Sequence, residues 1–228
     1  MVVRRLSRPG IKEDRGRVLI IAAGEECGGS VRMVQEQLGK LLQCEVVLGT
    51  GHVDTWRSEV AGATEGVILL QTASVLRHPI RLLQLFEANR QQYPIVCVNV
   101  VGAGYDFATV TPLLASLWTE LSQEDMEILR TELLVDGQGM GKLSSSLGRA
   151  VPNAISVFFN QGGGAAAVDA AIKDIVLKMG RTAELCAERT QSRLNLLCSG
   201  EEKWVVPPVW RQKACRVSLR PPLRPSPD

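Results

Sequence analysis

The chain has 228 residues, 45% of them hydrophobic, and a formal net charge of +2 at pH 7. This length fits one domain with terminal segments or two small domains, and the apolar content suffices for a full core. The balanced charge gives no global basic field, so we expect no nucleic acid partner. We find no apolar run of about 18 residues and no signal peptide at residues 1–10, and we expect a cytoplasmic protein without a membrane span.

The cysteines and histidines argue against a metal centre. Six cysteines occur without a CxxC pair, and the two histidines are His52 and His78. A zinc site needs several such ligands at short, regular spacings. We therefore expect reduced cysteines, no metal and no bound cofactor.

Five short apolar runs are typical of strands buried on both faces of a parallel sheet. They are residues 17–23, 44–48, 66–71, 94–101 and 154–159. Between and after these runs, apolar residues recur at helical spacing and predict helices over residues 31–42, 55–63, 80–90, 107–121, 122–134 and 165–179. Ser30 is a candidate N-cap, Asp106 is the predicted N-cap of the helix that follows it, and the glycine- and serine-rich residues 136–149 allow a short helix. The alternation predicts a three-layer, flavodoxin-like α/β fold: a five-stranded parallel sheet in the order 2-1-3-4-5, with helices on both faces.

The ends of the chain differ in composition from its middle. Residues 1–16 are predicted to be a disordered lead-in, and the leucines over 181–202 allow a helix. Residues 203–228 hold six of the eleven prolines and six Lys or Arg against one Asp. We predict a disordered basic tail there, with a tether for a partner as the alternative. The folded domain is predicted to be residues 17–180.

Two segments carry a resemblance to a known family. Residues 70–88 read LQTASVLRHPIRLLQLFEA, and residues 93–108 read YPIVCVNVVGAGYDFA. The pattern, which extends over about residues 17–179, resembles a TIR (Toll/interleukin-1 receptor) domain of the plant and algal type. The resemblance implies the same flavodoxin-like fold. It also implies self-association or binding to other TIR domains, chiefly through the loop after the second strand. The residues of this loop (the 49–54 loop) are Gly49, Thr50, Gly51, His52, Val53 and Asp54.

Some TIR domains hydrolyse NAD, and the resemblance places their essential glutamate at Gln84. Glutamine forms hydrogen bonds but carries no negative charge, and losing one such electrostatic group costs a factor of about 10² to 10³ in rate. Glu87, one turn further along the predicted helix, is the candidate substitute. The candidate contacts to a bound NAD are Glu25, Ser30, Arg77 and Arg81.

Three hypotheses follow from these residues. The first is a TIR-type interaction module, used in signalling or innate-immune-like assemblies, that forms weak homo-oligomers or binds other TIR domains and lacks NAD hydrolase activity. The second is an NAD hydrolase with a rearranged carboxylate, for which NAD is a substrate. The third, from a different class, is a non-catalytic nucleotide-binding sensor. Self-association, NAD turnover and binding without turnover distinguish them.

Overall fold

The computed structural model describes residues 16–23 and 28–180. By its internal contacts the chain divides into two units, Met1–Cys186 and Ala187–Asp228, and every described residue lies in the first. The predictions for residues 1–15, 181–202 and 203–228, and the candidate Glu25, fall outside the described residues. Within those residues, no helix combines the length and apolar character needed to cross a membrane.

Five parallel strands form one sheet in the order β2-β1-β3-β4-β5, which confirms the predicted flavodoxin-like topology. The strands are β1 (Arg17–Ile21), β2 (Glu45–Leu48), β3 (Gly66–Gln71), β4 (Ile95–Val100) and β5 (Val157–Phe159). All six residues of β3 are buried because this central strand is covered on both faces. β5 is shorter than predicted, since residues 154–156 are not part of the strand.

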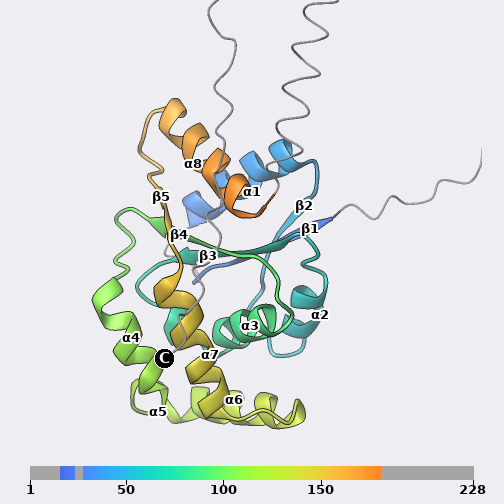
Figure 1. Ribbon diagram of the computed structural model, residues 1–228, viewed down its shortest axis with the longest axis vertical. Helices are drawn as coiled ribbons and strands as arrows, with labels where there is room; N and C mark the ends of the chain where they lie inside the picture. The colour runs from blue at the N-terminus through green and yellow to red at the C-terminus, as the bar shows by residue number, and fades with distance from the viewer. Residues whose placement is uncertain (1–15, 24–27, 181–228) are drawn as a thin grey trace, which may run out of the picture. The chain divides into compact units, whose positions relative to one another are not determined.

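Helices cover both faces of the sheet (Figure 1). They are α1 (Gly28–Leu42), α2 (Trp56–Ala61), the 3₁₀ turn η2 (Val75–Arg77), α3 (Pro79–Arg90), α4 (Phe107–Ala115), α5 (Leu117–Glu120), α6 (Gln123–Val135), α7 (Met140–Asn153) and α8 (Ala165–Lys178). Alternate residues of β3 serve the two layers: Ile68 and Leu70 pack with α1 and α8, whereas Val67 and Leu69 face the layer of α2, α3, α4, α6 and α7.

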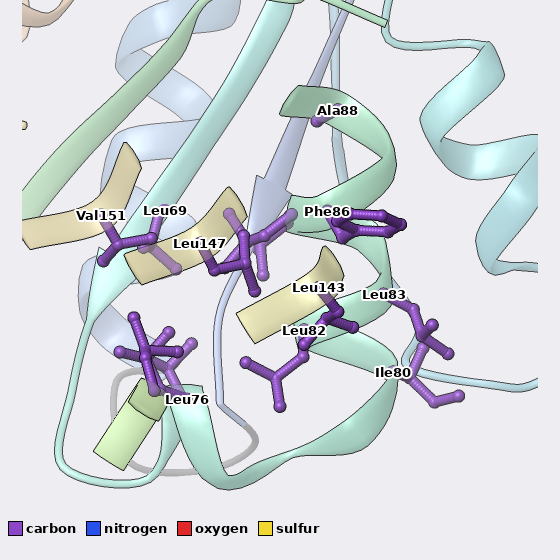
Figure 2. Close-up of a cluster of buried hydrophobic side chains, with 14 of the residues drawn as sticks. Leu69, Leu76, Ile80, Leu82, Leu83, Phe86, Ala88, Leu143, Leu147 and Val151 are labelled. Atoms are coloured by element: carbon purple, nitrogen blue, oxygen red, sulfur yellow. The ribbon is translucent and has the colours of Figure 1, made fainter. Parts of the chain in front are cut away.

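Helix α7 corrects the prediction for residues 136–149. The sequence analysis allowed a short helix there, whereas α7 has 14 residues and continues to Asn153. Its Leu143, Leu147 and Val151 recur every four residues and lie buried in the cluster that includes α3, as Figure 2 shows. Serine and glycine weaken the intrinsic helix propensity here, but tertiary packing of one apolar face stabilises the helix.

Two helix boundaries also differ from the sequence prediction. Residues 107–121 form two helices, because Ser116 leaves helical geometry (φ −125°, ψ 38°) four residues after Pro112. Ser30 is not an N-cap, since α1 begins two residues earlier at Gly28. Asp106 is the predicted N-cap: its carboxylate accepts a hydrogen bond from the Ala108 N–H at 2.9 Å.

Candidate functional site

The 49–54 loop follows β2 at the carboxyl edge of the sheet and lies against α3. The Gly49 N–H donates to the carbonyl of Ile20 in β1 at 2.9 Å, which fixes the start of the loop to the sheet. Further along, Val53 is 41% exposed. The loop is therefore anchored at its start and open to solvent at its tip.

Gln84 lies in α3 and is 0% exposed. Its Nε2 donates to Glu59 Oε2 at 2.7 Å, and its Oε1 accepts from Arg81 Nη1 at 3.1 Å. Both polar atoms of the amide are thus engaged inside the protein. A buried amide with satisfied partners has a structural role in fixing its neighbours.

Glu59, on α2, is the carboxylate that the sequence reasoning missed. It accepts hydrogen bonds from the Thr50 N–H at 3.1 Å, the Thr50 hydroxyl at 2.6 Å and the Thr55 hydroxyl at 3.1 Å. Partial burial raises the pKa of Glu59, but these hydrogen bonds and the charge of Arg81 outweigh it, so the pKa is lowered. Glu59 is therefore ionised at neutral pH. One signal was available in the sequence, because Glu59 is the acidic residue of α2, four residues after Thr55.

Helix α2 has six residues and depends on its neighbours for its position. Trp56 is 1% exposed, and its indole N–H donates to Glu132 Oε2 of α6 at 3.0 Å. Arg57 stacks on the Trp56 ring at 4.3 Å and also pairs with Glu132 and Asp136. These contacts hold Glu59 in place opposite Gln84.

Arg81 fills the space between the 49–54 loop and α3. Its side chain is buried, and its Nη1 donates to the Gly49 carbonyl at 2.9 Å. A Cβ at Gly51, where φ is +76°, would lie 2.9 Å from Arg81 Nη2. A glycine is needed at this position both for its backbone conformation and for the space that the guanidinium occupies. Arg81, a candidate NAD contact in the sequence analysis, thus contacts the protein's own loop.

The other predicted site residues lie apart from this network. Glu87 accepts from Arg90 Nε and Nη2, each at 2.7 Å, and among the described residues no hydrogen bond joins it to Gln84. Arg77 Nη1 pairs with Glu120 at 3.1 Å, and both side chains are partly exposed. Ser30 is buried and donates to Gln161 Oε1 at 3.0 Å.

Ser30 and Gln161 line a polar cavity of about 320 Å³ at the carboxyl ends of β4 and β5, and this cavity does not include Arg77, Arg81 or Gln84. Among the described candidate NAD contacts, Ser30 therefore lies in a different place from Arg77 and Arg81. In the described part of the chain, no group of three or more His, Cys, Asp or Glu residues is arranged to hold a metal ion.

No family model matches the sequence, and no curated protein matches it significantly.

Proposed function

We propose that the chain is a cytoplasmic TIR-type interaction module that acts in signalling by binding other TIR domains or further copies of itself, and that it does not hydrolyse NAD. The observation that supports this most is the complete burial of Gln84 between Glu59 and Arg81. A neutral amide whose two polar atoms are engaged supplies neither negative charge nor a proton acceptor to a substrate.

The same network gives the 49–54 loop a defined shape. Arg81 binds the Gly49 carbonyl, and Glu59 binds both the N–H and the hydroxyl of Thr50. A loop that is ordered before binding loses less conformational entropy when a partner docks. Since Val53 remains 41% exposed on this loop, it offers an apolar contact for association.

Light scattering against protein concentration tests the assembly. We expect the average mass of the wild type to rise with concentration and to stay low for Val53→Asp. Leu177→Asp is the matched control, because Leu177 on α8 is similarly exposed, at 44%, and lies on the other helical layer. If Val53→Asp and Leu177→Asp associate alike, or if the wild type remains monomeric throughout, the proposal is wrong.

A second function, NAD hydrolysis, is favoured by one observation. Glu59 is an ionised carboxylate that contacts Gln84 at 2.7 Å, so it is better placed to substitute for the family glutamate than Glu87. This function requires that the wild type releases nicotinamide from NAD, that Glu59→Gln does not, and that Glu87→Gln still does. Absence of nicotinamide release by the wild type would exclude it and leave the interaction module.

A further inference from the structure

A groove between α3 and α7 lies away from the Gln84 network. It encloses a cavity of about 560 Å³, bounded by the carboxyl-terminal end of α3, the turn before α7 and the outer face of α7. The apolar residues Phe86 and Ala150 form part of its wall. This volume is in the range of small-molecule sites.

Among the described residues, three cations and no carboxylate line this groove. They are Arg90, Lys142 and Arg149. Glu87, just outside the lining, neutralises Arg90 through two hydrogen bonds. Lys142 and Arg149 form no ion pair with any described residue. The groove therefore keeps about two uncompensated positive charges.

The two unpaired cations lie on one side of α7. They are seven residues apart, which in an α-helix is two turns, or about 10.5 Å along the axis. Between them lies Ser146, whose hydroxyl oxygen accepts from Asn89 Nδ2 of α3 at 2.7 Å. Because that oxygen is already an acceptor for Asn89, its proton is oriented away from Asn89 and is available to an acceptor in the groove.

The amino-terminal end of α7 adds to the positive potential. Gly139 is its N-cap and provides no side-chain capping bond, while Lys142 lies in the first turn. The free N–H groups and the helix dipole both favour negative charge there. The cations, the serine hydroxyl and the helix end thus all suit an extended anion.

We propose that the groove between α3 and α7 binds a small molecule that carries a chain of two or three phosphates. The phosphates lie along α7 between Lys142 and Arg149, and any organic part lies against Phe86 and Ala150. Arg149 offers a planar fork of donors that fits phosphate oxygens, and Lys142 offers a compact charge. A ligand with one negative charge would leave one of the two cations uncompensated.

Isothermal titration of the full chain with inorganic triphosphate, and separately with ATP, tests this proposal. We expect saturable binding with one site, and about tenfold weaker affinity for each of Lys142→Ala and Arg149→Ala, since each removes a charge-assisted contact. Tighter binding of ATP than of triphosphate would identify a nucleotide as the ligand. Equal affinities would identify the phosphate chain as the recognised part.

The control separates the groove from general attraction of anions to the chain. Lys142→Ala/Arg149→Ala and Lys40→Ala/Arg130→Ala each remove one lysine and one arginine from exposed helix positions. The first double variant should bind about 100-fold more weakly than the wild type, and the second should bind as the wild type does. All four side chains are exposed, so both variants should keep the wild-type Tm. Equal weakening in the two double variants, unchanged affinity in the first, or no saturable binding by the wild type would overturn the proposal.

Discussion

Replacing Gln84 by glutamate tests the network between α2 and α3 directly. In the wild type, the Gln84 amide donates to Glu59 at 2.7 Å and accepts from Arg81 at 3.1 Å. A carboxylate at this position has no N–H to donate. Gln84→Glu therefore sets two negative oxygens against each other in a site that is closed to solvent at position 84.

The size of the effect follows from the separation and the burial. Two unit charges about 4 Å apart repel each other by about 4 kcal/mol at an effective dielectric constant of about 20, which corresponds to about 3 pKa units. Arg81 offsets part of this repulsion because it already contacts position 84. We expect Gln84→Glu to lower the free energy of unfolding by about 1 to 3 kcal/mol at pH 8.

The sign of the pH dependence is the sharper part of this prediction. The carboxyl pair in Gln84→Glu has a folded-state pKa raised above its unfolded value, because one proton is retained between the two groups. The folded state of Gln84→Glu is therefore fully stable at pH values below the unfolded-state pKa of about 4.3. It loses stability as the pH rises through the raised folded-state pKa. The wild type has no such pair at this site.

Urea unfolding at pH 5 and pH 8 measures both effects. We expect Gln84→Glu to be less stable at pH 8 than at pH 5, relative to the wild type. The exchange variant Glu59→Gln/Gln84→Glu should regain most of the loss, because an amide and a carboxylate face each other again. If Gln84→Glu matches the wild type at both pH values, the closed network is wrong.

Three further predictions test other parts of the fold. The pKa of Glu59 is lowered from its ordinary value of 4.5, because its hydrogen bonds outweigh its partial burial. The ionised carboxylate therefore stabilises the fold above pH 4.5, and this stabilisation is lost as the pH falls through the lowered pKa. Glu59→Gln should flatten the acid limb of a plot of Tm against pH. Leu147→Ala removes a fully buried side chain of α7 and should lower the free energy of unfolding in urea by about 2 to 5 kcal/mol. Leu177→Ala, at an exposed site, should lower it by less than about 1 kcal/mol. Equal losses in the two variants would contradict the packing of α7. Gly51→Ala should destabilise the protein by about 1 to 2 kcal/mol, because φ is +76° there and Arg81 must move. Gly148→Ala, in open space within α7, should instead stabilise it by about 0.5 to 1 kcal/mol. A stabilising Gly51→Ala and a destabilising Gly148→Ala in thermal unfolding would refute both arguments.

The sheet could be predicted from the sequence because a strand that is buried on both faces is itself a short run of apolar residues. The five apolar runs became the five strands, and loops rich in glycine or polar residues follow most of them. With helices between the strands, short right-handed crossovers leave few topologies, and the order 2-1-3-4-5 is one of the commonest. Asp106 was found for the same reason, since an N-cap depends on adjacent residues only.

Helix α7 and the Gln84 network depended on the tertiary structure. The serines and glycines of residues 136–149 have weak helix propensity, and the helix forms because Leu143 and Leu147 are buried against the α3 layer. Glu59 lies 25 residues from Gln84 in the sequence, so no local spacing pairs them. A buried polar group needs a hydrogen-bond partner, and the fold can supply that partner from any part of the chain. Such pairs therefore have no regular spacing in the sequence. The sequence by itself determined the strands and their order. Only packing decided which polar groups meet at Gln84 and which cations of α7 have no ionic partner among the described residues.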